Sequence, residues 1–325
     1  MNKVLIIGDL HISDRFSGRH KDYFENCFYC LDMIEKSIVD NNITHLICLG
    51  DWIGIGLAEK NLKDRRSLLK LIQVLQRWNN LLNGNVYSLR GNHDIGKNMT
   101  DYDFFVSIGL LKNIPEVDIG SCRFHLFNYG EETREIKLDE DKYNVGCFHS
   151  NLLIEGLTTW YQGGVGVELS TLTNLKGIST AIAGHIHNPS KRLVSTSIGD
   201  SAIDLFYPGC PTRPRMEVNM WDECYGVIFN ITDELTSMDV ITYKLKPISE
   251  VFVESAEDDI VDYEDGEVTT FDLETMNQIL SELSLFNVNA GKDYTSQIKR
   301  MAGLDKVAAD IALDYLEKIE AEFKK

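Results

Sequence analysis

Five short polar motifs within the first 190 residues gather the side chains of this sequence that are best suited to hold a metal ion. In chain order they are Asp9-Leu10-His11, Gly50-Asp51, Gly91-Asn92-His93-Asp94, His149 and Gly184-His185-Ile186-His187. A lone Asp-x-His or Asn-His arises by chance in many chains, but these motifs hold five of the eight histidines. Their carboxylates, imidazoles and one amide oxygen together suit manganese, iron or zinc.

Each motif directly follows a run of apolar residues. Val4–Ile7 precedes the first motif, Leu46–Leu49 the second and Val86–Leu89 the third, while Val145–Phe148 and Ile182–Ala183 precede the last two. Short apolar runs of this kind are typical of buried strands. Because open α/β sheets place their sites beyond the carboxyl ends of their strands, the five motifs are expected in site-forming loops.

The elements that position these motifs can be predicted from the same alternation. In the first half, strands are expected at 4–7, 44–49 and 85–89, and helices at 23–39 and 63–82, a pattern typical of βαβ units. From about residue 120 the pattern changes to short strands at 123–128, 144–148, 180–183, 202–207, 226–231 and 239–245. We therefore predict an α/β fold, a two-sheet sandwich flanked by helices.

Three regions are expected along the chain. Residues 1–250 form the α/β domain, 251–270 an acidic linker and 271–325 a small C-terminal helical hairpin. The hairpin helices each carry apolar residues along one face. That face either binds a partner or covers the protein's own sheet, and the sequence leaves both alternatives open.

The charge of the chain constrains its partners. Of the net charge of −18, the segment from residue 255 onward contributes −10, with 17 acidic and 7 basic residues. A protein that held nucleic acid by phosphate neutralisation alone would show a basic excess. If the substrate is DNA, a partner or a local basic rim must supply much of the binding.

The cysteines and the apolar segments indicate a reduced protein without a membrane span. The seven cysteines show no paired spacing beyond Cys27 and Cys30, whose Cys-x-x-Cys lies in a predicted helix with no second pair downstream. No apolar stretch is long enough to cross a membrane, and the N-terminal run meets Asp9 too early for a signal peptide. A cytoplasmic location is therefore expected.

The order of the five motifs resembles that of the calcineurin-like metallophosphoesterases, D-x-H, G-D, G-N-H-[DE], H and G-H-x-H, over roughly residues 3–230. The resemblance implies two divalent metal ions. One would be held by Asp9, His11, Asp51 and His187, and the other by Asp51, Asn92, His149 and His185. Asp51 would therefore be shared, and Gly50, Gly91 and Gly184 would let the backbone turn close to the metals.

The resemblance also implies catalytic roles for two residues that follow Asn92. Two cations held about 3.5–4 Å apart clamp a phosphoryl group and activate a water. His93 would act as a general acid or stabilise the developing charge on the scissile phosphate. Asp94 would orient His93 by a hydrogen bond, with an exposed loop acid as the alternative.

The surroundings of the motifs narrow the substrate class. The protein phosphatase branch has an arginine soon after Gly-Asp, and residues 52–56 contain none. The segment Phe206–Arg213 resembles the Y-x-G-S-P-x-R segment of the SbcD family of DNA nucleases. This resemblance implies a manganese-dependent exonuclease and endonuclease, mainly 3′-to-5′, that acts in DNA recombination, repair or replication. It also implies a homodimer, an SbcC-like SMC-type ATPase as partner, and a bacterial or phage-infected cell as the setting.

The chain departs from the SbcD pattern in two places. Residues 53–55 lack the expected aspartate, and few residues remain for a DNA-capping domain before the linker. The basic residues that could contact DNA phosphates are Arg15, Arg19, His20, Lys21, Arg213 and Arg215. Two further hypotheses stay open: a free-standing phosphodiesterase for small or cyclic nucleotides, and a non-catalytic binding platform with this fold.

Overall fold

The computed structural model describes residues 1–14, 22–54, 59–154, 166–190, 193–214, 221–232 and 236–252. All of them belong to one unit of the chain, Met1–Val261. Most of the predicted linker and the whole predicted hairpin lie outside the described residues. Five of the six basic residues proposed for DNA contacts lie outside them too, namely Arg15, Arg19, His20, Lys21 and Arg215.

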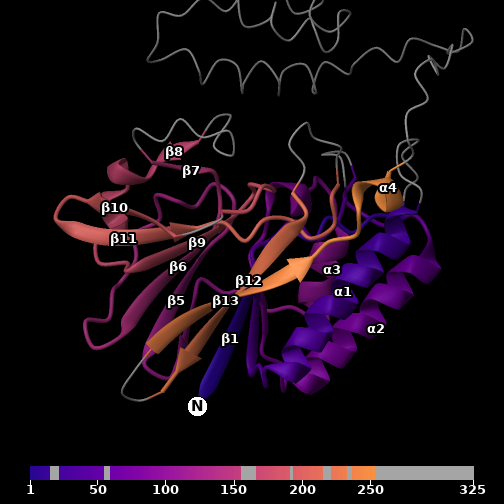
Figure 1. Ribbon diagram of the computed structural model, residues 1–325, viewed down its shortest axis with the longest axis horizontal. Coiled ribbons are helices and arrows are strands. Elements are labelled where there is room, and N and C mark those ends of the chain that lie inside the picture. The colour runs from indigo at the N-terminus through magenta and orange to yellow at the C-terminus, as the bar shows by residue number, and fades with distance from the viewer. Residues whose placement is uncertain are drawn as a thin grey trace, which may run out of the picture. The chain divides into compact units, whose positions relative to one another are not determined.

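Two sheets form the body of this unit (Figure 1). The first has the strand order β13-β12-β1-β2-β3, with β1, β2 and β3 parallel and β12 and β13 antiparallel to their neighbours. Its strands are β1 (Asn2–Ile7), β2 (His45–Cys48), β3 (Val86–Ser88), β12 (Glu223–Ile231) and β13 (Thr236–Lys244).

The second sheet has the order β10-β11-β9-β6-β5-β4, and its four central strands are parallel. Its strands are β4 (Glu116–Ile119), β5 (Cys122–Phe127), β6 (Tyr143–His149), β9 (Thr180–Gly184), β10 (Val194–Ile198) and β11 (Ser201–Phe206). A separate two-stranded sheet pairs β7 (Leu152–Leu153) with β8 (Val167–Glu168).

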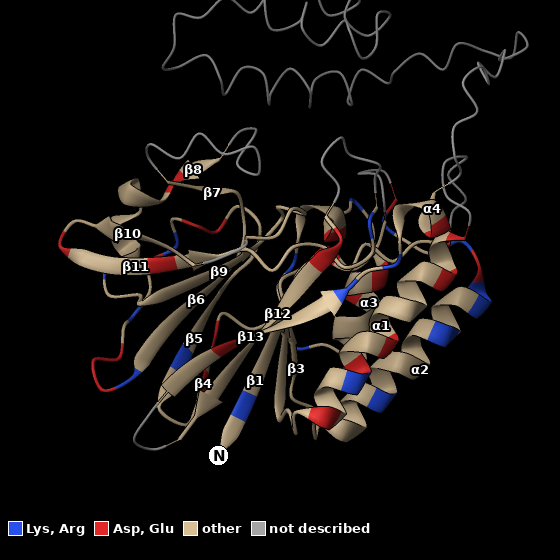
Figure 2. Cartoon of the chain, in the orientation of Figure 1, with Lys and Arg blue, Asp and Glu red and all other residues tan. Residues whose placement is uncertain are grey.

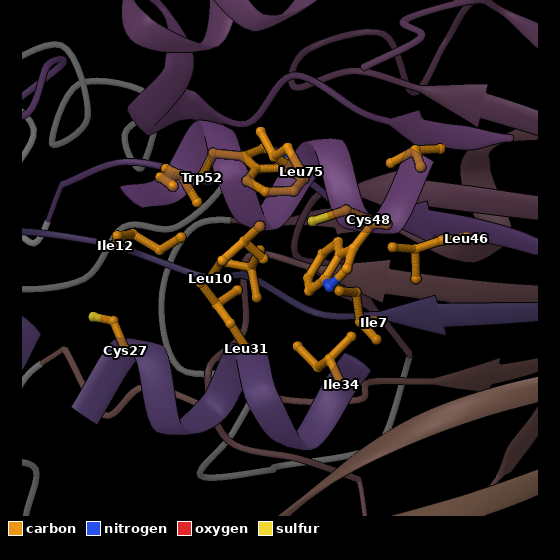
Figure 3. Close-up of a cluster of buried hydrophobic side chains, with 14 of the residues drawn as sticks. Ile7, Leu10, Ile12, Cys27, Leu31, Ile34, Leu46, Cys48, Trp52 and Leu75 are labelled. Carbon is orange, nitrogen blue, oxygen red and sulfur yellow. The ribbon is translucent and has the colours of Figure 1, made fainter. Parts of the chain in front are cut away.

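Alternation along the strands decides which layer each side chain enters. In β1, Leu5 and Ile7 join the core shared with the helices, whereas Val4 and Ile6 join the core between the two sheets. This division follows from the period of two in a strand, which sends successive side chains to opposite faces. Figure 3 shows part of the first core, where Leu31 and Trp52 lie among the residues between the helices and the strands.

The helices pack on the outer face of the first sheet (Figure 1). They are α1 (Tyr23–Asp40), α2 (Arg65–Leu81) and α3 (Asp101–Ser107), and a short α4 (Ile248–Val251) follows β13. The N-termini of α1 and α2 are capped by aspartates, since Asp22 accepts from the Glu25 N–H and Asp64 from the Arg66 N–H. Each cap satisfies a donor that the helix itself leaves without a partner.

The predicted α/β class and two-sheet sandwich are confirmed, with the expected strands and the two long helices displaced by at most a few residues at their ends. The sequence prediction missed α3, α4, β4, β7, β8 and β10, which are short or rich in serine and threonine. All seven cysteines are free and buried, and Cys30 Sγ donates to the carbonyl of Pro211 at 3.0 Å. Within the described residues, no helix is both long and apolar enough to cross a membrane.

Candidate metal centre

Strand ends from both sheets bring the five motifs together. Asp9 and His11 follow β1, Asp51 follows β2, and the turn Asn92–Asp94 follows β3. His149 is the last residue of β6, and His185 follows β9 directly. Two hydrogen bonds join the sheets here: the His185 N–H donates to Asp9 Oδ2 at 2.8 Å, and His149 Nδ1 donates to the carbonyl of Leu49 at 2.6 Å.

The first group of ligand atoms comes from Asp9, His11 and His187, whose ligand atoms all lie within 4.8 Å of one another. The Nε2 atoms of His11 and His187 are 2.9 Å apart. His11 Nδ1 is 2.8 Å from the carbonyl oxygen of Gly54. Because a carbonyl can only accept, this contact places the proton of neutral His11 on Nδ1 and leaves a lone pair on Nε2.

The second group comes from Asp51, His149 and His185, again within 4.8 Å of one another. The side-chain oxygen of Asn92 completes it, at 3.0 Å from His149 Nε2 and 3.1 Å from His185 Nδ1. Since His149 Nδ1 donates to the carbonyl of Leu49, the neutral form of His149 presents the lone pair of its Nε2 toward this oxygen. Acceptor atoms that converge in this way need either a proton or a cation among them.

Asp51 lies between the two groups. Its Oδ2 atom is 3.5 Å from His11 Nε2 in the first group and 3.3 Å from His149 Nε2 in the second. Its Oδ1 atom accepts from the backbone N–H of His93 at 2.8 Å. The carboxylate is therefore held by one oxygen and offers the other to both groups.

The donor set fits two divalent cations. Each group combines imidazole nitrogens with carboxylate oxygen, a mixture that suits manganese, iron or zinc. The buried Oδ1 atom of Asp9 has no hydrogen-bond partner within the described part of the chain, which leaves it available as a ligand atom. The seven predicted ligand positions thus form one His/Asp cluster that is consistent with a dimetal site.

Burial and the close packing of charged groups shift the pKa values of several side chains in the cluster. Burial raises the pKa of Asp9 to about 8. Burial would lower the pKa of His149, but the Asp51 carboxylate beside it raises that pKa to about 10. Burial and the neighbouring His149 lower the pKa of His185 to about 4. Carboxylates packed this closely need compensating positive charge, which a divalent cation supplies.

The backbone of the centre is held in the left-handed region at three ligand residues, with φ of 44° at His11, 50° at Asp51 and 74° at His185. Such conformations cost about 1–3 kcal/mol each outside glycine and persist where the surroundings impose them. The glycines of the motifs are required for close approach, as expected. A Cβ on Gly91 would lie 2.1 Å from Asp51 Oδ1.

His93 lies at the boundary of the centre. Its side chain is buried, and its ring meets the His11 ring edge-on, with centroids 4.7 Å apart. One of its ring nitrogens also falls within 4.8 Å of ligand atoms of His11 and Asp51. A general acid needs this proximity to the reacting group, and the role of His93 as that acid stays a prediction.

The predicted role of Asp94 needs correction. It is neither an exposed loop acid nor hydrogen-bonded to the His93 ring within the described part of the chain. It is buried, and its carboxylate accepts from the backbone N–H groups of Asp51 and Gly91 through Oδ2 and of Trp52 through Oδ1. The reason is its place at the third position of a tight turn, from which the side chain points back to the start of that turn.

Arg213 also departs from its predicted role. Its side chain is only 1% exposed, and its guanidinium lies 3.4 Å from the Asp222 carboxylate. A buried guanidinium is poorly placed to contact a DNA phosphate, so we do not retain Arg213 as a DNA contact.

Two residues near the centre escaped sequence analysis. Lys60 is half-buried, and its Nζ atom donates to the carbonyl of Asn92 at 3.0 Å. Tyr129 is 43% exposed, and its ring lies 5.7 Å from that of His185 and 6.2 Å from that of His149, centroid to centroid. Neither residue belongs to a motif, and no spacing rule could have placed them here.

Adding Mn²⁺ to metal-free protein is expected to raise the melting temperature by about 5–10 °C. A ligand at 100 times its dissociation constant stabilises the native state by about 2.7 kcal/mol, and each kcal/mol shifts Tm by about 2–4 °C in a domain of this size. Differential scanning fluorimetry with EDTA-treated protein measures this shift. The increment should vanish in Asp9→Ala and persist in His45→Gln, a half-buried histidine at the opposite end of β2. An equal increment in both variants would place the metal elsewhere.

Comparison with known proteins gives one family match. The sequence model of the calcineurin-like phosphoesterases matches residues 2–189. The search of curated proteins gave no match. Among solved structures, a dimetal phosphatase from Danio rerio has 10% identity and a TM-score of 0.44, covering 75% of this chain and 99% of its own. Zinc-bound Vps29 from Entamoeba histolytica has 13% identity and a TM-score of 0.36, with coverages of 75% and 99%.

Proposed function

The chain belongs to the calcineurin-like phosphoesterase family, and from that premise we propose that it is a two-metal phosphodiesterase that cleaves DNA. The observation that carries the phosphodiesterase part is the position of Asp51, whose Oδ2 atom faces a histidine of each ligand group. Metal ions held there would supply Lewis-acid activation of the phosphoryl group and of a water nucleophile.

The residues around the centre have two roles in this proposal, metal binding and proton donation. Asp9, His11 and His187 hold one side of the centre, and Asn92, His149 and His185 hold the other. His93, beside His11, carries a ring proton that it donates to the leaving oxygen. Asp9, His11, His93 and His149 are buried, whereas Asn92, His185 and His187 are half-buried on the more open side of the centre. Burial strengthens the electrostatic effect of the first four on charges that develop during the reaction.

DNA is favoured as substrate by the SbcD-like segment Phe206–Arg213. Its residues are tied to the motif loops: the Cys210 N–H donates to the carbonyl of His187 at 2.9 Å, and Thr212 Oγ1 donates to the carbonyl of Leu10 at 2.6 Å. The segment is therefore hydrogen-bonded to two of the loops that carry ligands. Tyr129, exposed beside the histidines, adds an aromatic face of the kind on which nucleobases stack.

The charge distribution supports a partner. Figure 2 shows Lys and Arg spread among Asp and Glu, with several along α2. A chain with a net charge of −18 holds DNA weakly by phosphate neutralisation. We therefore propose an SbcC-like SMC-type ATPase as the partner that holds the DNA. On the SbcD resemblance we also propose manganese as the metal and a homodimer as the working form, in DNA recombination, repair or replication.

The acidity of the chain also favours a second candidate, a free-standing phosphodiesterase for small or cyclic nucleotides. Such a substrate needs no long basic surface, and the same ligand residues would act on it. Hydrolysis of a cyclic dinucleotide with none of duplex DNA, even with the ATPase partner added, would select this candidate.

The deciding experiment follows the degradation of end-labelled duplex and single-stranded DNA in the presence of Mn²⁺. The wild-type protein is expected to release label or produce a ladder, and His93→Ala, prepared identically, is expected to do neither. Retained cleavage by the variant would point to a contaminating nuclease. No cleavage of DNA by the wild type, together with hydrolysis of bis-p-nitrophenyl phosphate, would contradict DNA as the substrate of the free protein.

A further inference from the structure

Two loops that carry ligands of the centre are joined by a reciprocal pair of carboxylates. The loop after β2 contains Asp51, and the turn after β3 contains Asn92, His93 and Asp94. The Asp94 carboxylate accepts from the Asp51 N–H at 2.8 Å, while the Asp51 carboxylate accepts from the His93 N–H at 2.8 Å. Each carboxylate thus holds the backbone of the other's loop.

Asp94 makes three such bonds, and all of its donors are backbone groups. Its Oδ2 atom accepts from Asp51 at 2.8 Å and from Gly91 at 2.9 Å, and its Oδ1 atom accepts from Trp52 at 2.9 Å. Successive N–H groups beside a left-handed residue form a concavity that favours an anion. Asp51 has a φ of 50°, and the Asp94 carboxylate occupies the concavity beside it.

This arrangement fixes the direction of the shared carboxylate. The Asp94 carboxylate holds the backbone of Asp51, and the His93 N–H holds its Oδ1 atom. These two restraints set the orientation of the Asp51 side chain. They leave Oδ2 at 3.5 Å from His11 Nε2 and 3.3 Å from His149 Nε2. If the backbone of Asp51 relaxed from the left-handed region, Oδ2 would leave the position between the two histidines.

We propose that Asp94 is a positioning residue that assembles the two-metal centre, because its carboxylate holds the loop of Asp51 in the one conformation in which both metal groups share Oδ2. In this arrangement Asp94 acts through Asp51, and both of its carboxylate oxygens are taken up by backbone N–H groups. The inference rests on the proposed two-metal function. It predicts that loss of the Asp94 carboxylate weakens metal binding and the magnetic coupling between the two metals in protein that is still folded.

The test is Asp94→Asn. An amide has one acceptor oxygen and one NH₂ group, so either orientation sets a donor against at least one of the backbone N–H groups of Asp51, Trp52 and Gly91. The matched control is Asp101→Asn, a carboxylate that also accepts a backbone N–H, from Leu62 at 2.7 Å, but lies at the start of α3.

Three quantities are measured on each purified protein: the melting temperature without metal, the Mn²⁺ dissociation constant by calorimetry, and the electron paramagnetic resonance spectrum of the Mn²⁺-loaded protein. For Asp94→Asn we expect Mn²⁺ affinity to fall about 10–100-fold, as it does when the support of a metal ligand is removed. We also expect the spin-coupled signal of a metal pair to be replaced by that of isolated ions. Asp101→Asn should keep the affinity and the coupled signal, whatever its melting temperature.

A lower melting temperature with unchanged affinity and coupling in Asp94→Asn would overturn the proposal, because Asp94 would then be only structural. If Asp94→Asn does not fold, Asp94→Glu carries the same test, since it keeps both oxygens one methylene further out. For Asp94→Glu we expect a coupled signal weaker than that of the wild type. Full coupling at wild-type affinity would count against the proposal. None of these measurements uses a substrate. Their outcome therefore does not depend on whether the protein cleaves DNA.

Discussion

Replacing Asp51 with asparagine is expected to lower kcat/KM for phosphodiester hydrolysis by about 10³-fold or more, even at saturating Mn²⁺. Asp51 places one carboxylate oxygen 3.5 Å from His11 Nε2 and 3.3 Å from His149 Nε2, so both groups of the centre depend on it. Bound metal contributes several kcal/mol of transition-state stabilisation. Since each 1.36 kcal/mol is about tenfold in rate, losing the shared ligand costs about three orders of magnitude or more.

The measurement is steady-state hydrolysis of bis-p-nitrophenyl phosphate, with metal content determined on the same samples. Asp118→Asn is the matched control, because its carboxylate is 44% exposed on β4 and pairs with Arg123 and Lys142, each at 2.7 Å. That variant should keep wild-type kinetics. A loss of less than tenfold in Asp51→Asn, with two metals still bound, would show that the centre does not need a shared carboxylate.

Much of this centre could be predicted because each ligand lies at the end of a strand or a few residues beyond it, and the sequence marks those strands clearly. The runs before Asp9, Asp51 and His149 are apolar and fully buried in the structure. A strand buried on both faces is a continuous apolar run. The change from apolar to polar residues therefore marks its end and the start of the motif that follows. The fold class followed from the same runs.

The residues that were missed or misassigned act through the backbone or through distant contacts. Asp94 was expected to bond its neighbour His93, but its side chain turns back to N–H groups 42 and 43 residues earlier, whose direction depends on the left-handed φ of Asp51. Tyr129 reaches the histidines because its own N–H is held by the carbonyl of Arg90 at 2.9 Å. Hydrophobic periodicity predicts helices and strands, and it carries no information about either of these contacts.

The short elements were missed for a related reason. Helix α3 has seven residues and depends on the capping box in which Thr100 and Asp103 exchange hydrogen bonds. Strand β10 consists of Val194–Ile198 with serine and threonine between its apolar ends, and its pairing with β11 alone makes it an edge strand. Tertiary pairing decides such segments more than intrinsic propensity does.

Replacing His93 with alanine is expected to lower kcat by about 10²–10⁴-fold, the usual contribution of a general acid. His93 lies against His11, with ring centroids 4.7 Å apart, and its backbone N–H rather than its ring holds Asp51. Because alanine keeps that N–H, the shared carboxylate should stay in place and both metals should remain bound. Metal analysis of the purified variant therefore separates a catalytic role from a ligand role.

The leaving group decides between the two catalytic roles of His93. A nitrophenolate departs without a proton, whereas the alkoxide of a nucleoside requires one. If the ring donates the proton, His93→Ala should lose far more activity on a dinucleotide than on bis-p-nitrophenyl phosphate. An equal loss on both substrates, with His45→Gln unaffected, would mean that His93 stabilises charge on the phosphate. Loss of one metal ion in His93→Ala would instead place His93 among the ligands, beside His11 and Asp51, with which it forms a compact group.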